Sequence, residues 1–232
     1  MKPPSAKARI GRQTPTTAFV LPYEKTCGAE AVELYNSTGR AAQEWQELLL
    51  YDLLAENADG LWTHTKFGYS VPRRNGKNEV VAMRELYGIV KRGEHILHTA
   101  HRTTTTHSAW ERLLNLLAKA NIPIASSYRA FGKEHIELEN GGKVEFRTRT
   151  SKGGLGEGFD LLVIDEAQEY QDDQESALKY VVTDSQNPQT VFCVVRWQCQ
   201  KNAKIKNRRM EWRSHAPAPV PQRTGKKNTI RI

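Results

Sequence analysis

Residues suited to phosphate chemistry cluster in the segment VPRRNGKNE at 71–79, between a predicted strand and a predicted helix. Gly76 lets the backbone approach a phosphate closely, and Lys77 adds a mobile positive charge. Backbone N–H groups at the start of a helix also favour an anion. The segment departs from the GxxxxGK(S/T) pattern, because Val71 stands at the first glycine position and Asn78 at the hydroxyl position.

The neighbours of this Gly-Lys pair extend the predicted phosphate loop. Arg73 and Arg74 would stabilise charge on a transferred phosphoryl group, and Asn75 belongs to the same nucleotide-binding stretch. Asn78 would cap the following helix, or its side-chain oxygen would approach Mg²⁺. A helix entry carrying ordinary surface cations remains the alternative interpretation of this loop.

A second segment, LLVIDEAQEY at 161–170, places two carboxylates directly after four apolar residues. The apolar run is typical of a buried parallel strand, and ligands bind at the carboxyl ends of such strands. Asp165 would hold Mg²⁺, and Glu166 would orient or deprotonate an attacking water. The alternative is a strand followed by an acidic helix cap.

The patterns around these segments predict an α/β fold with a largely parallel sheet flanked by helices. Together with the two motifs, they indicate a P-loop NTPase of the ASCE type, in which a catalytic glutamate follows the metal-binding strand. Helices are expected at 41–56, 78–90, 108–120 and from Asp172, strands at 61–71, 96–100, 161–164 and 190–194, and a hairpin at 135–149.

The chain of 232 residues divides into parts of different charge. Its net charge is +8, but residues 1–195 carry −2 and residues 196–232 carry +10. We expect an N-terminal arm at 1–40, an ATPase domain at 41–195 and a basic, disordered tail at 196–232. Three cysteines without CxxC spacing and no apolar run of transmembrane length favour a reducing cytoplasm and no membrane partner.

At these residues the sequence resembles the ATPase half of tailed-bacteriophage terminase large subunits. The resemblance spans about residues 40–195 and is carried mainly by VPRRNGKNE and LLVIDEAQEY, with support from HTAHRTTTTHSAWERLL at 98–114 and SKGGLGEGFD at 151–160. Trp45-Gln46 looks like the family's adenine-recognition element. Gln46 would then bond the adenine edge, although an ordinary surface helix residue is the alternative.

The resemblance implies an ATPase motor that uses ATP and Mg²⁺ to package double-stranded DNA into capsids. It also implies a portal protein and a small terminase subunit as partners, a homo-oligomeric ring on the portal, and a place in the host cytoplasm. A nuclease domain follows the ATPase half in this family.

The family pattern stops near Val194, where a coupling motif is due and VVRWQCQKNAKIKNRRMEW follows instead. We expect a truncated chain, with a sheet incomplete at its C-terminal side, no nuclease domain, and a tail that is out of frame relative to the family or otherwise replaced. The missing coupling motif argues against productive hydrolysis, whereas ATP binding does not depend on it.

Two other functions remain open from the sequence. A helicase-like, DNA-stimulated ATPase would also carry Asp-Glu-Ala-Gln, but its loop would usually end in Gly-Lys-Thr/Ser, without Arg73 and Arg74. A non-enzymatic nucleic-acid binder would act through the basic tail, because its charge would attract phosphate backbones without sequence preference. A solvated tail with no evolved role is the simplest reading of that segment.

Overall fold

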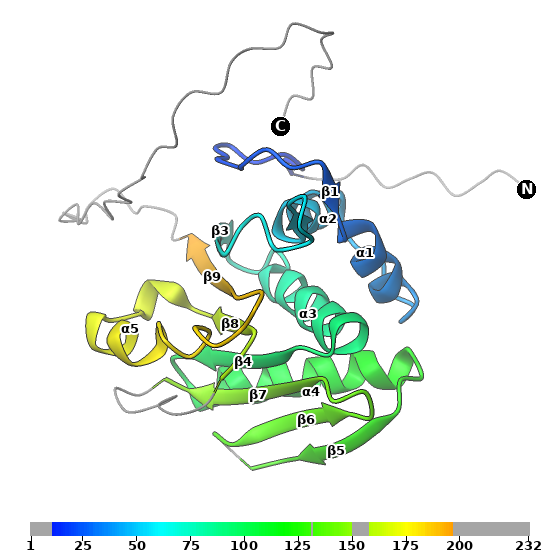
Figure 1. The fold of residues 1–232 in the computed structure, drawn as a ribbon, viewed down its shortest axis with the longest axis vertical. Coiled ribbons are helices and arrows are strands. Elements are labelled where there is room, and N and C mark those ends of the chain that lie inside the picture. The colour runs from blue at the N-terminus through cyan, green and yellow to red at the C-terminus, as the bar shows by residue number, and fades with distance from the viewer. Residues whose placement is uncertain (1–10, 131, 150–157, 197–232) are drawn as a thin grey trace, which may run out of the picture.

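A seven-stranded sheet forms the centre of the molecule (Figure 1), with the order β3-β9-β8-β4-β7-β6-β5. The computed structural model describes residues 11–130, 132–149 and 158–196. The strands of this sheet are β3 (Lys66–Pro72), β4 (His95–Ala100), β5 (Ile124–Tyr128), β6 (Glu134–Leu138), β7 (Lys143–Thr148), β8 (Leu161–Ile164) and β9 (Gln189–Arg196). A separate antiparallel pair is formed by β1 (Lys25–Thr26) and β2 (Ala55–Glu56).

Five neighbouring strands of the sheet, β3, β9, β8, β4 and β7, run parallel, as the sequence predicted for most of the sheet. The remaining two, β6 and β5, extend it as an antiparallel hairpin and edge. Within the described part of the chain, β3 forms the opposite edge. The parallel pairing brings the carboxyl ends of β3, β9, β8 and β4 to one side of the molecule, where both predicted motifs follow their strands.

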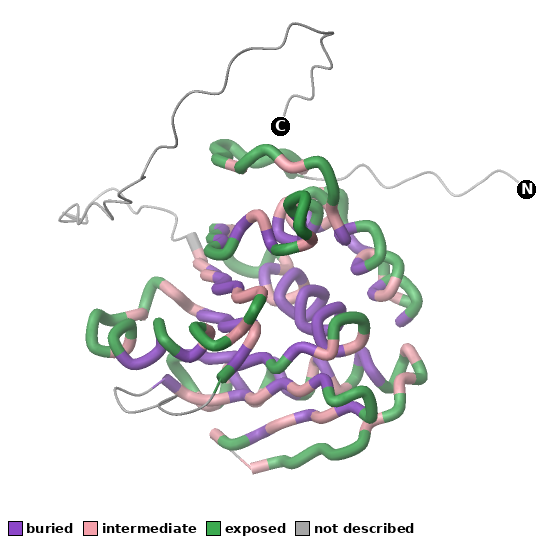
Figure 2. Tube along the Cα trace, viewed as in Figure 1, coloured by how far each residue is buried: buried purple, intermediate pink, exposed green. Residues whose placement is uncertain are grey.

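Helices cover both faces of the sheet and bury its central strands (Figure 2). One face packs against α1 (Gly28–Asn36), α2 (Glu44–Leu53), α3 (Lys77–Tyr87) and α4 (Thr103–Lys119). The other face packs against α5 (Asp172–Leu178). In β4, Ile96 joins the first core and Leu97 the second. This alternation explains why the central strands are almost continuously apolar.

The helix predicted at 78–90 is confirmed in outline. Its α-helical part, α3, continues into a single π-helical turn, η1 (Gly88–Arg92). Gly93 follows in the left-handed conformation (φ 64°), which is the glycine stop that the sequence indicated.

Two helix starts differ from the prediction. The helix predicted at 108–120 begins earlier, at Thr103, after the cap residue Arg102, whose carbonyl accepts the backbone N–H of Thr106 at 3.2 Å. The spacing of Asp172 and Glu175 predicts Asp172 as the cap of the following helix, but the cap is Gln171 and Asp172 is the first residue of α5.

The predicted N-terminal arm contains a helix that belongs to the core. α1 buries Ala31 and Tyr35 against the same cluster as α2 and α3. The residues described before Tyr23 form no helix or strand. Most of the loop at 151–160 and of the tail at 196–232 lies outside the described residues, so the expectations for them stay predictions.

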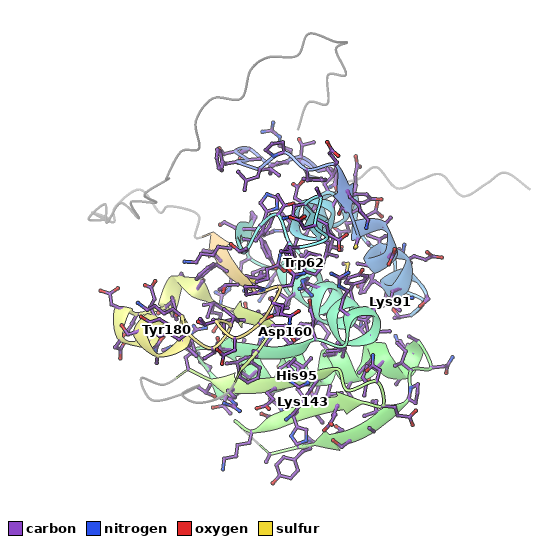
Figure 3. All side chains as sticks on the ribbon, viewed as in Figure 1. Trp62, Lys91, His95, Lys143, Asp160 and Tyr180 are labelled. Carbon is purple, nitrogen blue, oxygen red and sulfur yellow. The ribbon has the colours of Figure 1, made fainter. Side chains whose placement is uncertain are left out.

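The amino ends of the central strands are held by side chains that have no part in the predicted chemistry. Asp160 and His95 lie near each other (Figure 3), and Asp160 Oδ2 accepts the backbone N–H of His95 at 2.9 Å. The other oxygen of Asp160 accepts the hydroxyl of Ser185 at 2.6 Å. These contacts join the start of β4 to the residue that precedes β8.

Candidate nucleotide-binding site

The predicted phosphate loop joins β3 to α3 at the carboxyl edge of the sheet. Gly76 and Arg74 both have left-handed backbone conformations (φ 84° and 64°). Asn75 closes the loop, because its Nδ2 donates to the carbonyls of Pro72 at 3.1 Å and Arg73 at 3.2 Å. Gly76 is the helix cap. The prediction that Asn78 caps α3 is therefore wrong, since Asn78 is already inside the helix.

Lys77 contacts Asp165 directly, although 88 positions separate them in the sequence. Nζ of Lys77 forms an ion pair with Oδ1 of Asp165. Both side chains are buried, with 9% and 2% of their surface exposed. The two motifs thus meet at one place, where the lysine amine neutralises the charge of the carboxylate.

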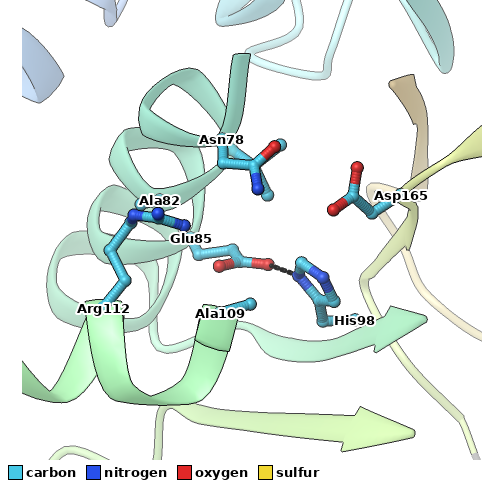
Figure 4. A pocket seen from close by; sticks show the side chains of 8 residues that line it. Asn78, Ala82, Glu85, His98, Ala109, Arg112 and Asp165 are labelled. Carbon is cyan, nitrogen blue, oxygen red and sulfur yellow. Dashed lines mark hydrogen bonds and ion pairs between the residues drawn. The ribbon is translucent and has the colours of Figure 1, made fainter. Parts of the chain in front are cut away.

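Asn78 and Asp165 face the same small pocket between α3, α4 and the sheet (Figure 4). Behind them, Nδ1 of His98 lies 2.6 Å from Oε1 of Glu85, and both residues are buried. The described part of the chain holds no cluster of three or more His, Cys, Asp or Glu side chains that could bind a metal alone. A carboxylate and an amide oxygen suit Mg²⁺, which usually takes its remaining ligands from water and phosphate.

Glu166 stands at a sharp backbone turn after β8. Its φ of 52° is in the left-handed region, which costs a non-glycine residue free energy. Its backbone N–H donates to Oδ1 of Asp165 at 2.8 Å. Glu166 is partly exposed, whereas Asp165 is buried. The turn therefore separates two adjacent carboxylates into different environments.

The structure places Gln46 against the phosphate loop. Its Nε2 donates to the carbonyl of Gly76 at 3.2 Å, and its Oε1 accepts the backbone N–H of Gln43 at 2.9 Å. Gln43 and Gln46 form a reciprocal capping box at the start of α2. Gln46 is thus buried beside the loop, while Arg73 and Arg74 are exposed on it.

Supporting residues that the sequence analysis did not single out surround the site. Oη of Tyr69 donates to the carbonyl of Lys77 at 3.0 Å, and burial raises the pKa of this phenol well above its ordinary value. In the first turn of α3, Glu79 accepts hydrogen bonds from Tyr35, Arg40 and Arg112. These contacts join α1, α3 and α4 around the start of the loop helix.

Arg149, just after β7, was also missed. Its guanidinium donates to the backbone carbonyls of Asp165 and Glu166. Such acceptors leave no trace in the sequence, and the polar and apolar alternation of 143–149 is typical of a strand with a solvated face.

The same arrangement of strands and helices occurs in solved phage proteins. The HK97 bacteriophage large terminase matches with a TM-score of 0.56 and 16% identity, over 74% of this chain and 38% of that one. A mutant of the Thermus phage P74-26 large terminase ATPase domain matches with a TM-score of 0.53 and 12% identity, over 72% of this chain and 71% of that one. The chain has the fold of a large terminase ATPase domain.

The terminase-type fold confirms the predicted α/β architecture. No protein-family model matches the sequence, and no curated protein matches it. The chain spans less than half of the length of the HK97 large terminase. In the described part of the chain, no helix has both the length and the apolar character needed to cross a membrane.

Proposed function

We propose that this chain binds ATP with Mg²⁺ at the loop of residues 73–78 and serves as the ATPase domain of a phage DNA-packaging motor. The observation that carries the proposal is the buried ion pair between Lys77 and Asp165. It joins a glycine-lysine helix entry to a carboxylate at the end of a neighbouring strand, which is the arrangement that P-loop NTPases use for phosphate and metal.

Each residue of the site receives a role from its position. Lys77 and the backbone N–H groups at the start of α3 bind the β- and γ-phosphates. Asp165 and Asn78 would hold Mg²⁺, which would neutralise the charge that develops on the phosphates. Lys77 must release Asp165 when the metal and the nucleotide bind, because Mg²⁺ would need the carboxylate with which the ammonium is now paired.

Glu166 orients or deprotonates the attacking water, since its partly exposed carboxylate stands beside the buried metal ligand. Arg73 and Arg74 stabilise charge on the transferred phosphoryl group from the exposed side of the loop. Gln46 contacts adenine from its place beside Gly76. Its Nε2 has a second N–H and its Oε1 a second lone pair beyond the bonds to Gly76 and Gln43, so the amide can still bond an adenine edge.

The DNA-packaging context rests on the terminase-type fold and on the sequence resemblance. We propose double-stranded DNA as the translocated substrate, with a portal protein, a small terminase subunit and a homo-oligomeric ring as partners. A helicase-like ATPase has less support, because Arg73 and Arg74 stand in the loop and Asn78 replaces the usual hydroxyl.

Titration of the whole chain with a fluorescent ATP analogue and Mg²⁺ tests this proposal. The wild-type chain should bind at one site, and Lys77→Ala should not. Lys91→Ala, which removes an exposed lysine beyond α3, is the matched control and should bind like the wild type. Equal affinities of the wild type and Lys77→Ala would refute the site.

A further inference from the structure

Arg149 lies at the end of β7 and reaches across β4 to the end of β8. Its backbone N–H donates to the carbonyl of Ala100 at 3.0 Å, which continues the pairing between β7 and β4. The residue is buried, with 6% of its surface exposed. No motif predicted a role for it.

The guanidinium of Arg149 binds backbone carbonyls at the carboxyl edge of the sheet. Nη1 donates to Asp165 O at 2.5 Å and to Thr99 O at 3.2 Å, and Nη2 donates to Glu166 O at 3.2 Å. Burial lowers the pKa of Arg149, while the nearby Asp165 and Glu166 charges oppose that shift. Burying the Arg149 cation with only backbone carbonyls as its acceptors costs free energy. These particular contacts therefore need an explanation.

The contacts coincide with the strained turn at Glu166. A left-handed glutamate persists only when its surroundings hold it, and Arg149 binds the carbonyls of the two peptide groups on either side of the Glu166 Cα. The planar fork of a guanidinium binds two acceptors in fixed geometry, which a lysine amine cannot reproduce. The centre of the Tyr170 ring lies 5.7 Å from the guanidinium carbon of Arg149 and further confines the guanidinium.

We infer that Arg149 is a positioning residue, which holds the backbone of Asp165 and Glu166 so that one carboxylate faces the metal and the other the water. This inference rests on the proposed ATP site. Arg149 touches neither nucleotide nor metal in it, and acts through the two carboxylate residues. Outer partners of metal ligands typically contribute roughly 10- to 100-fold to metal affinity or activity.

The test compares Arg149→Gln and Arg149→Lys with the wild type in titrations with mant-ATP, once in EDTA and once in Mg²⁺. Arg149→Gln should keep the metal-free affinity, which depends on Lys77 and the loop. Its gain in affinity from Mg²⁺ should be smaller by roughly 10- to 100-fold. Arg149→Lys, which keeps the charge but not the fork, should recover part of that gain.

Arg147→Gln is the matched control, because Arg147 lies two positions earlier on β7 and pairs with Glu145. It should keep the full gain from Mg²⁺. A wild-type gain in Arg149→Gln would overturn the inference, as would loss of the fold in both Arg149 variants, judged by thermal melting. A wild-type chain with no affinity for mant-ATP would instead overturn the proposed function itself.

Discussion

Replacing Lys77 with alanine should destabilise the nucleotide-free protein by about 3–5 kcal/mol, because the change leaves Asp165 as a buried carboxylate without its cation. The magnitude follows from the burial of both partners, since an exposed pair would contribute only about 0–1 kcal/mol. For a chain of this size, a loss of that order lowers the melting temperature by roughly 6–20 °C.

Urea denaturation without nucleotide measures this loss and separates it from any effect on binding. The double variant Lys77→Ala/Asp165→Ala is the control, because it removes the orphaned charge together with its partner. It should be more stable than Lys77→Ala alone, despite losing the bond from the Glu166 N–H. The reasoning is refuted if Lys77→Ala unfolds within about 0.5 kcal/mol of the wild type, as an exposed substitution would.

Four further outcomes follow from the structure. Glu166→Gln should keep Mg²⁺-dependent ATP binding and abolish any turnover that the wild-type chain supports; equal, measurable turnover in both would remove Glu166 from its role. Glu166→Gly should raise the free energy of unfolding by about 1 kcal/mol in urea, because glycine adopts the left-handed conformation without strain, and a lower value would contradict this. Burial lowers the pKa of His64, whose Nε2 accepts the N–H of Leu21, so the folded protein binds fewer protons there than the unfolded chain. The contribution of His64 to the free energy of unfolding should therefore be complete above the ordinary pKa of 6.5 and fall as the pH drops through it. In urea denaturations at a series of pH values, His64→Gln should flatten this fall. An unchanged dependence of the unfolding free energy on pH would exclude His64 as the cause. Deleting residues 197–232 should weaken DNA binding in a low-salt gel-shift assay and leave ATP binding intact, because those residues hold most of the basic excess; unchanged DNA binding would place the contact elsewhere.

The parts of the fold that the sequence could predict are those with strong local patterns. The buried strand at 161–164 and the helix after the phosphate loop were evident from apolar runs and turn residues. The direct pairing of Lys77 with Asp165 was not predicted. Parallel strands end at the same edge of a sheet, which explains why both motifs lie on one side of the molecule, but the ion pair itself is known only from the structure.

The missed elements depend on tertiary contacts. β5 reads IASSY and is mostly exposed, so it carries no alternation and exists through its pairing with β6. α1 is short, and its helical stripe consists largely of Ala31 and Tyr35, which become informative only against α2 and α3.

The side-chain interactions within the site were the least predictable. Arg149 binds backbone carbonyls, and every residue has one, so no residue type marks its partners. Gln46 was singled out as a base-binding residue, and the structure shows it in a capping box that also touches Gly76. The adenine role therefore stays a prediction, made from a position that fits it.

The most direct test of the ATP site is a crystal structure of the whole chain with Mg²⁺ and a non-hydrolysable ATP analogue. We predict phosphates against the backbone N–H groups of residues 74–78, Lys77 moved from Asp165 to the phosphates, and Mg²⁺ beside Asp165 and Asn78. Phosphates bound elsewhere, or Lys77 still paired with Asp165 while the analogue is bound, would contradict this prediction.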